Sequence, residues 1–346
     1  MRKYILISLV ILTILGTLNV TAQTKWAQTG FQFLSVNSDA RAVAMGEAFT
    51  AVSGNSMSIF YNPANIGFMK SFLDFSLNQN KWIADINYYS GSIAFRPWQG
   101  KYGVIAFSVL SVDYGEFIGA IPVADPTTGK DYTETGNFSP NAFSFGTAYS
   151  KAITDRFSFG VHFKYASQDL GSSLLPSPNR DPGDPNDFTT ISKDYSEGVL
   201  AFDFGTVYRT GYKSLAFGMS VQNFSKEVKF ENEGFQLPLV FNMGVSMDLT
   251  DWLMPDNKTH SFLLAIDANH PRAAPEQLKI GGEYSFLNLI ALRGGYNSNI
   301  SERDVSFGVG LRKDFGSKGG KIALDYAYTP FGVFDYVQRF SFGLSL

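Results

Sequence analysis

The sequence contains no cysteine. This absence excludes disulfide scaffolds, thiolate zinc sites, cysteine nucleophiles and the lipid-modified cysteine of a lipoprotein. The 28 Lys and Arg residues nearly balance the 31 Asp and Glu residues, so the net charge of −3 gives no electrostatic basis for binding nucleic acid. Histidine is scarce, and neither a G-x-S-x-G nucleophile elbow nor a Walker A phosphate loop is present. The sequence therefore predicts a protein that is not an enzyme and needs no cofactor.

Long hydrophobic runs are absent except at the N-terminus, which reads MRKYILISLVILTILGTLNVTAQ. There, Arg2-Lys3 precedes an apolar stretch over 4–18, and Val20-Thr21-Ala22 matches the small-residue signal for cleavage before Gln23. We interpret residues 1–22 as a secretory signal peptide. The apolar stretch is shorter than the roughly 20 residues of a spanning helix, which disfavours an uncleaved anchor. The mature chain is then either an exported soluble protein or one that crosses a membrane as strands.

Phenylalanine, tyrosine and glycine are abundant, with 32, 17 and 33 residues, whereas charged residues make up only 17% of the chain. In the stretch RFSFGVHFKYAS, large apolar residues alternate with small or polar ones. One face of this stretch carries Phe157, Phe159, Val161, Phe163 and Tyr165. The other face carries Ser158, Gly160, His162 and Lys164. Alternation with a period of two predicts β-strands, and it recurs from here to the C-terminus.

A soluble β-sandwich also alternates, but the large apolar face recurs in nearly every strand and no second sheet is evident to cover it. The opposite face is rich in Gly and Ser with occasional charges. This pattern is typical of a lipid-facing exterior and a polar lumen. We therefore predict an all-β transmembrane antiparallel barrel of about 14 strands over residues 71–346. An even strand number also closes the sheet, so that no edge stays unpaired in lipid.

The connections between the predicted strands support this topology. The strands are predicted at 71–79, 85–96, 101–113, 139–151, 156–168, 194–209, 212–224, 239–249, 260–270, 276–286, 288–297, 303–314, 320–330 and 335–346. The long connections, predicted to lie outside, are 114–138, 169–193 and 225–238. The short connections, predicted to lie inside, are 97–100, 152–155, 210–211 and 287, and 250–259 breaks this trend. Long outer loops and short inner turns are typical of outer-membrane barrels.

Residues 23–70 do not follow the alternation, and we predict that they form an N-terminal hatch, or plug, inside the barrel. Small residues such as Ala40 and Gly46 favour compact structure there. In FYNPANIGF, residues 60–68, Pro63 fixes its own φ and disfavours helix at Asn62, which predicts a turn. A barrel of fourteen strands is wide enough to need such filling, or to be left open.

At these residues the chain resembles a known family. The stretches are Asp39-Ala40-Arg41-Ala42, Met45-Gly46, Ala48-Phe49-Thr50-Ala51-Val52 and Tyr61-Asn62-Pro63-Ala64, and they resemble the opening of the PorV/PorQ family. That family is related to FadL-type transport barrels, which share the Asn-Pro-Ala element. The resemblance implies a plugged fourteen-stranded barrel in the outer membrane of a Gram-negative bacterium. For PorV and PorQ members it implies service in type IX secretion, beside a large translocon barrel and exported cargo. The chain departs from the aromatic C-terminus of many such barrels, because Leu346 stands there.

Charged residues of both signs are predicted to face the lumen. They are His162, Lys164, Asp203, Asp267, Lys279, Glu283, Arg293, Arg312 and Asp325. They either pair with one another and with the plug, or line a substrate path. Mixed signs favour pairing, so we predict that Arg41, Gly46, Asn62 and Pro63 anchor the plug, with Arg41 bound to a wall carboxylate and Asn62 capping the turn. For His162 to act in a hydrolase, a Ser or Asp partner would be needed, and a wall role is the stronger interpretation.

The loop NRDPGDPNDFTT carries Asp181, Asp184 and Asp187, whose oxygens are of the type that calcium prefers. The spacing matches no EF-hand, so we interpret it as a solvated outer loop and predict no metal site. An exposed loop is also a candidate protein contact. Three functions follow. The first is a secretion-associated barrel that binds a translocon or cargo through its outer loops and rim. The second is a FadL-like channel for hydrophobic small molecules. The third is a structural barrel with no transport role. Outer-membrane lipid is the expected surrounding of each.

Overall fold

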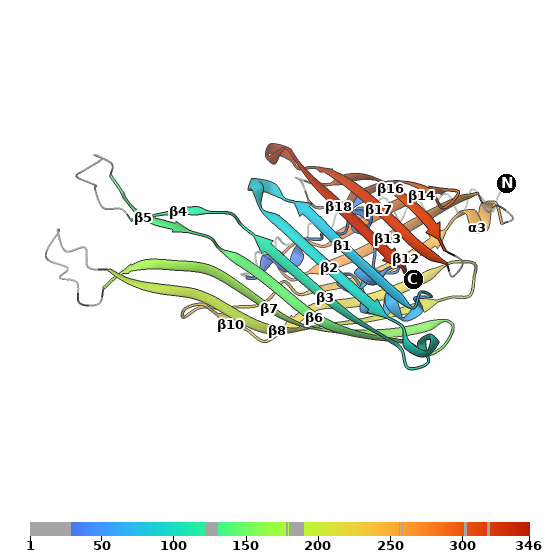
Figure 1. The fold of residues 1–346 in the computed structure, drawn as a ribbon, viewed down its shortest axis with the longest axis horizontal. Helices are drawn as coiled ribbons and strands as arrows, with labels where there is room; N and C mark the ends of the chain where they lie inside the picture. Colours follow the sequence, from blue (N-terminus) through green and yellow to red (C-terminus); the bar gives the residue numbers. More distant parts are fainter. Residues whose placement is uncertain are drawn as a thin grey trace, which may run out of the picture.

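The computed structural model describes residues 29–121, 131–177, 179, 190–255, 257, 259–300, 303–316 and 319–346. Within these residues, fourteen antiparallel strands close into a barrel (Figure 1). The barrel strands are β1 (Leu73–Lys81), β2 (Asn87–Phe95), β3 (Val104–Asp113), β6 (Asn141–Ala152), β7 (Phe157–Pro176), β8 (Thr190–Arg209), β9 (Ala216–Ser225), β12 (Val240–Asp248), β13 (His260–Pro271), β14 (Gln277–Phe286), β15 (Ile290–Asn297), β16 (Val305–Phe315), β17 (Gly320–Pro330) and β18 (Tyr336–Ser345). The predicted all-β barrel of fourteen strands is confirmed.

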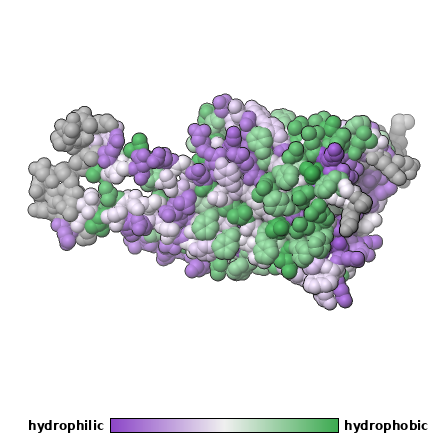
Figure 2. Space-filling view, in the orientation of Figure 1, coloured by the Kyte–Doolittle hydropathy of each residue, from purple (hydrophilic) through white to green (hydrophobic). Residues whose placement is uncertain are grey.

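The alternation in the sequence becomes an inner and an outer face of the barrel. Along β3, Val104 and Ala106 are fully buried, whereas Ile105 and Phe107 are 40% and 53% exposed. The apolar side chains gather over the barrel strands, while the surface of the projecting hairpins is mostly hydrophilic or mixed (Figure 2). An apolar outer band around a polar interior is the arrangement that a bilayer requires of a barrel. The chain thus has the fold of a β-barrel membrane protein.

The first and last strands close the barrel. β1 pairs with β18 from Asp74↔Ser345 to Lys81↔Gln338, and the amide of Phe72 donates to the carbonyl of Leu346 at 2.7 Å. The barrel has two unlike ends. We call the end where β3 connects to β6, β7 to β8 and β9 to β12 the long-loop end. We call the opposite end, where β1 begins and β18 ends, the short-turn end.

Short helical turns fill several of the connections. At the short-turn end, the 3₁₀ helix η5 (Pro97–Gly100) links β2 to β3, and α3 (Thr250–Leu253) lies between β12 and β13. At the long-loop end, η4 (Ile83–Asp85) links β1 to β2 and η6 (Gly332–Phe334) links β17 to β18. In the part of the chain that the structure describes, no helix is long and apolar enough to cross a membrane.

The predicted outer loops contain more strand than the sequence pattern indicated. β7 and β8 run past the predicted limits at 168 and 194 and stay paired from Ser172↔Asp194 to Pro176↔Thr190. The predicted loop 169–193 is wrong to that extent. Small hairpins also occupy the other two long connections, namely β4 (Phe117–Ile121) with β5 (Thr133–Phe138), and β10 (Val228–Lys229) with β11 (Gly234–Phe235). The extended β7–β8 hairpin and the β4–β5 hairpin project beyond the rest of the barrel (Figure 1).

Residues 29–70, which we call the plug, lie within the ring of strands (Figure 1). Their short elements are η1 (Gln32–Ser35), α2 (Ala40–Ala44), η2 (Ser56–Phe60) and η3 (Pro63–Phe68). α2 contacts β15 to β18, η2 contacts β1 and β2, and η3 contacts β6 to β8. The plug therefore supplies much of the buried core, including Met45, Phe49 and Ile59. The predicted signal peptide 1–22 and the Asp-rich stretch 181–187 lie outside the described residues.

Candidate functional site: the plugged lumen

The plug runs through the lumen from the long-loop end to the short-turn end. Near its start, the amide of Gly30 donates to the carbonyl of Gln236 at 3.1 Å, next to the β10–β11 hairpin. Phe31 is buried there among aromatic rings, with ring centroids 5.8 Å from Phe33 and 6.0 Å from Phe235. Further along, the plug passes between the two sides of the wall before Phe72 leads into β1. Each side of the wall holds it by different chemistry.

The first half of the plug is held by ion pairs. Arg41, in α2, donates two hydrogen bonds of 2.8 Å to the two carboxylate oxygens of Glu283 on β14. The same carboxylate accepts from Arg293 Nε at 2.6 Å and from Arg312 at 2.8 Å, and Arg293 pairs with Asp325 at 2.7 Å. Glu283 is thus the shared anion of three arginines, and a bidentate arginine contact fixes both distance and orientation. This arrangement joins one predicted plug residue to four predicted lumen residues.

Asp39 begins α2 and adds a second acid beside this cluster. Its carboxylate accepts from the amide of Arg41 at 2.9 Å, which is the N-cap arrangement expected of aspartate. The residue is only 1% exposed. Burial raises the pKa of Asp39 to about 6, and the neighbouring Asp325 carboxylate acts in the same direction. Asp39 therefore titrates close to neutral pH.

Gly46 brings the plug backbone against the wall backbone. It has a φ of 62°, and a Cβ added there would lie 2.8 Å from the amide nitrogen of Tyr296. On the wall, a Cβ at Gly295 would lie 1.8 Å from the nitrogen of Gly46. Ser306 also donates to the carbonyl of Val43 at 2.6 Å. Glycine is the residue that permits both this φ and this approach.

Glu47 follows Gly46 and faces a group of cations. Its carboxylate lies 2.9 Å from Lys279 Nζ and 3.5 Å from Arg303. Burial alone would raise the pKa of Glu47, but Lys279 and Arg303 outweigh that effect and hold it at about 2. The predicted lumen residue Lys279 thus binds the plug. Glu47 itself was not among the residues predicted from the sequence.

A wall carboxylate also binds the plug backbone directly. Asp267, on β13, accepts 2.8 Å hydrogen bonds from the amides of both Phe49 and Thr50. Gly218 on β9 leaves room for this approach, because a Cβ there would lie 2.4 Å from the carbonyl oxygen of Thr50. A buried carboxylate that accepts two backbone amides fixes the position of the chain. Asp267 is therefore placed toward the plug, as a lumen-facing residue should be.

The turn in FYNPANIGF is held by neutral groups. Asn62 Oδ1 accepts from the amide of Ala64 at 3.0 Å and so caps η3. Its Nδ2 donates to the carbonyl of Thr50 at 2.8 Å and to that of Thr206, on β8, at 3.1 Å. Pro63 occupies the first position of η3, where its fixed φ suits a helix start. The sequence pattern predicted this cap and turn, and the structure adds the tie to the wall.

Small wall residues complete the contact with this turn. A Cβ at Gly160 would lie 2.4 Å from the carbonyl carbon of Pro63, and one at Gly205 would lie 1.9 Å from Asn62 Oδ1. Ser158 donates to the carbonyl of Ala64 at 2.9 Å. Gln222 on β9 donates to the carbonyl of Phe60 at 2.7 Å. The wall here presents serines, glycines and amides rather than charges.

His162, Lys164 and Asp203 form a further cluster on β7 and β8. Asp203 lies 3.1 Å from His162 Nδ1 and 2.8 Å from Lys164 Nζ. Ser108 Oγ lies 2.8 Å from His162 Nε2. The histidine therefore contacts both a serine and an aspartate, and the sequence alone did not identify either one as its partner. This order of contacts is that of a Ser-His-Asp triad. However, Ser108 and His162 are both buried, and Lys164 shares the aspartate. The cluster therefore has the geometry of a hydrogen-bonded wall.

The cavities show how completely the plug fills the lumen. Between the plug and the wall, the described residues enclose cavities of about 30 Å³, beside Phe60 and Lys164, and about 10 Å³, beside Glu47. Larger hollows lie at the two ends of the lumen, of about 500 Å³ beside Phe31 and about 1090 Å³ beside Phe68. A volume of 10 to 30 Å³ is on the scale of one water. Among the described residues, no cluster of three or more metal-ligating side chains was found.

A family model described as "Type IX secretion system membrane protein PorP/SprF" matches residues 132–346, more than half of the chain. The matched region contains β5 to β18 but not the plug. The plug sequence resembles that of the PorV/PorQ family. The family model matches a different part of the chain, and its description names the same secretion system, type IX. No curated protein sequence matches the chain.

Solved structures with similar folds include toluene transporters and a FadL homologue. The Ralstonia pickettii toluene transporter TbuX has a TM-score of 0.56 at 14% identity, with 88% of this chain and 96% of that chain covered. The Pseudomonas putida toluene transporter TodX has 0.56 at 13%, covering 93% and 98%. A Pseudomonas aeruginosa FadL homologue has 0.51 at 12%, covering 93% and 99%. At such identities the likeness concerns the fold. It confirms that the fold is FadL-like.

Proposed function

Because the chain belongs to the PorP/SprF family of type IX secretion system membrane proteins, we propose that it is an outer-membrane barrel that binds the translocon or exported cargo at its long-loop end. The family and the fold are those of a secretion or transport barrel, not of an enzyme. In this proposal the lumen stays closed, and recognition takes place on the projecting hairpins and the rim. The long-loop end would face outward, as long loops do in outer-membrane barrels. The predicted signal peptide 1–22 would direct export.

The β7–β8 hairpin is the observation that carries this proposal. Its pairing with β6 ends at Asn141↔Asp169, and its pairing with β9 ends at Ala201↔Ser225. Beyond these pairs the hairpin projects from the barrel (Figure 1), where β7 contacts β5, β8 contacts β10, and Lys193 and Tyr195 of β8 bind Glu231. Strand edges outside a sheet expose backbone amides and carbonyls that can pair with a strand of another chain. A partner with an extended segment or a β-domain would suit this surface.

The alternative is uptake of a hydrophobic small molecule through the lumen, in the manner of a FadL-type channel. The fold permits it, but a channel needs an apolar passage past the plug. The cavities of about 30 and 10 Å³ beside the plug are far smaller than the several hundred Å³ of typical ligand pockets. The closed lumen therefore supports the first function over the second. Neither function requires nucleic acid, a cofactor or a metal.

The test is an affinity purification of the tagged protein from its native outer membrane in mild detergent, with mass spectrometry of bound proteins and lipids. One variant replaces residues 170–195 with Asn-Gly, which joins Asp169 to its pairing partner Ser196 and removes only the projection. The matched variant Asn62→Ala alters the plug and keeps the hairpin. We expect a translocon barrel or exported protein with the native chain and with Asn62→Ala, and at least tenfold less with the shortened hairpin.

Two outcomes would overturn the proposal. One is undiminished partner recovery with the shortened hairpin, which would move recognition away from the projection. The other is recovery of a lone barrel carrying a hydrophobic small molecule, which would favour uptake and make the plug around Asn62 the functional element.

A further inference from the structure

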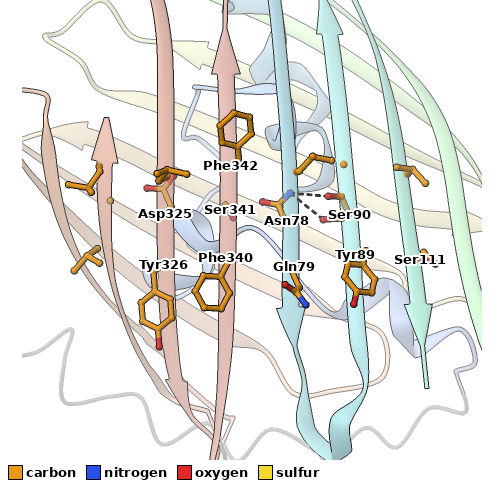
Figure 3. A pocket seen from close by; sticks show the side chains of 17 residues that line it. Asn78, Gln79, Tyr89, Ser90, Ser111, Asp325, Tyr326, Phe340, Ser341 and Phe342 are labelled. Atoms are coloured by element: carbon orange, nitrogen blue, oxygen red, sulfur yellow. Dashed lines mark hydrogen bonds between the residues drawn. The ribbon is translucent and has the colours of Figure 1, made fainter. Parts of the chain in front are cut away.

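A second concave surface lies on the membrane-facing side of the barrel. It is a groove of about 690 Å³ that crosses the outer faces of β1 to β3 and β16 to β18, over the seam where β1 pairs with β18 (Figure 3). It does not lead into the lumen. Behind it, the inward-facing Asn78 donates to Ser90 Oγ at 3.3 Å, and these side chains close the wall (Figure 3). The groove is therefore open to the bilayer alone.

A missing side chain creates the depth of this groove. Gly91 belongs to the outward-facing row of β2, where the larger side chains around it leave it buried, and its ordinary extended backbone does not require glycine. A Cβ there would point between Leu77 Cδ2, at 3.2 Å, and Val109 Cγ1, at 3.5 Å. Glycine inside a strand weakens the strand, and it commonly marks a place where another molecule approaches closely. The position therefore favours something seated on the floor of the groove.

The groove is ordered along the strands. Strand pairing aligns two outward-facing rows across it. The row nearer the short-turn end is entirely apolar and consists of Leu311, Leu324, Phe342, Leu77, Gly91 and Val109. The row nearer the long-loop end consists of Val309, Tyr326, Phe340, Gln79, Tyr89 and Ser111. Four members of this second row carry a polar group. Along most of these strands, the residue in the first row is apolar, and the residue in the second row, nearer the bilayer surface, carries a polar group.

The polar groups of the second row lack partners. Within the described part of the chain, the structure gives no hydrogen bond to the side chains of Gln79, Tyr89, Ser111 or Tyr326. An amide on a lipid-facing surface without a partner is costly, because hydrocarbon offers it none. A ligand that brings a polar head to this row would offset that cost. In Figure 3 the rings of Tyr326, Phe340 and Tyr89 and the amide of Gln79 lie together on one side of the groove.

We propose that this groove holds one lipid of the leaflet at the long-loop end. Its acyl chain would lie along the apolar row, over Gly91. Its ester or headgroup region would hydrogen-bond to Gln79 and the tyrosine hydroxyls. The polar-to-apolar order of the groove matches the direction of a lipid in that leaflet. A volume of about 690 Å³ leaves room for part of one lipid, with the remainder in the surrounding bilayer. This site is independent of the proposed secretion role.

The chain offers matched variants for a test. Gly91→Phe fills the floor of the groove, whereas Gly294→Phe places the same ring on the lipid-facing side of β15, where a Cβ meets nothing within 4 Å. Gln79→Leu removes the polar head contact. Gln338→Leu is its control, because Gln338 pairs with Lys81 outside the groove. The readout is native mass spectrometry of the mature protein in detergent micelles, with added 1-palmitoyl-2-oleoyl-phosphatidylethanolamine as the probe.

We expect the native chain to retain one lipid. Gly91→Phe should lower the lipid-bound fraction at least fivefold and Gln79→Leu about threefold, while the two controls match the native chain. Equal retention by Gly91→Phe and the native chain would overturn the site, as would equal loss in Gly91→Phe and Gly294→Phe. A polypeptide cross-linked to the groove in place of lipid would overturn it as well. If Gly91→Phe does not fold, as judged by heat-modifiable gel mobility, the comparison of Gln79→Leu with Gln338→Leu tests the site instead. Failure of the lipid-binding test would not affect the result of the partner-binding test.

Discussion

The two halves of the plug are held by opposite kinds of chemistry. Against β13 to β17, the segment around Arg41 and Glu47 is fixed mainly by ion pairs to Glu283 and Lys279. Against β6 to β9, the segment around Asn62 is fixed by neutral hydrogen bonds and by close backbone approach to glycines. One barrel therefore closes its lumen in two ways at once.

The difference predicts different kinds of failure. A buried ion pair contributes little net free energy when intact, but removing one partner leaves the other charge buried and unpaired. A neutral hydrogen bond costs less to lose, and its loss stays local. The charged half should therefore respond sharply to single substitutions and to pH. The neutral half should respond weakly to pH and strongly to added volume.

Glu283 is the position where the largest effect is expected. Glu283→Gln would leave Arg41, Arg293 and Arg312 without their shared anion, at a cost of about 3 to 5 kcal/mol in the free energy of unfolding. Urea unfolding followed by tryptophan fluorescence measures it. The control is Glu231→Gln, which breaks an exposed pair with Lys193 and should change little. Equal stability of Glu283→Gln and the native chain would mean that the ion-pair cluster does not hold the plug.

The adjacent glycines of β15 give the sharpest steric test. Gly295→Ala would push a methyl group into the backbone of Gly46, with an expected loss of about 1 to 3 kcal/mol in the free energy of unfolding and a loosened plug. Gly294→Ala, one residue earlier, faces lipid and should stay within about 0.5 kcal/mol of the native chain. Urea unfolding compares the two. If both variants behave alike, the close approach at Gly46 is not maintained in the membrane.

Asn62 tests the neutral half. Asn62→Ala removes the cap of η3 and the donors to Thr50 and Thr206, with an expected cost of about 1 to 3 kcal/mol in the free energy of unfolding. Asn62→Asp keeps the capping oxygen but turns a second carboxylate oxygen toward the carbonyl oxygens of Thr50 and Thr206 at a buried site, so at neutral pH it should be less stable than Asn62→Ala. Urea unfolding compares the two variants, and an Asn62→Asp variant as stable as the native chain would mean that these donors do not hold the turn.

The smallest expected effect is a pH dependence from Asp39. Its pKa is raised from 3.8 to about 6 in the folded state, so the stabilisation by its protonated form is complete below pH 3.8 and is lost as pH rises through 6. Between pH 5 and pH 8 this amounts to about 1 kcal/mol less stability of the folded barrel. Asp39→Asn should flatten this slope. Glu47 should contribute nothing to the slope in this range, because its pKa is lowered to about 2. An unchanged slope in Asp39→Asn would assign the dependence to another group.

The sequence pattern predicted the barrel because lipid imposes a period of two on every spanning strand. Where lipid ends, the signal ends, and the extension of β7 through DLGSSLLP was missed for that reason. Its backbone pairing continues, but the regular alternation of apolar and polar residues does not. The same limit applies to β4 and β5, which lie within a stretch that reads as a loop.

The plug contacts were predictable only in part. Arg41 and Asn62 stand out in the sequence, as a lone cation among small residues and as the residue before a proline. Their partners depend on register, which brings Glu283 and Thr206 to them across long separations. In the run Arg293-Gly294-Gly295, alternation places Gly295 on the lumen face with Arg293, but it cannot indicate that Gly46 of the plug lies against Gly295. Asp39, Glu47 and Ser108 were missed because their roles arise from neighbours distant in sequence.

Ion conductance in planar lipid bilayers measures whether the plug, anchored on both sides, closes the lumen. A closed lumen predicts no conductance steps from the native chain at neutral pH. It also predicts discrete steps from the double variant Glu283→Gln with Asn62→Ala, which weakens both anchors in a barrel that still folds. Steady conductance steps from the native chain would contradict the closed lumen and favour transport through it.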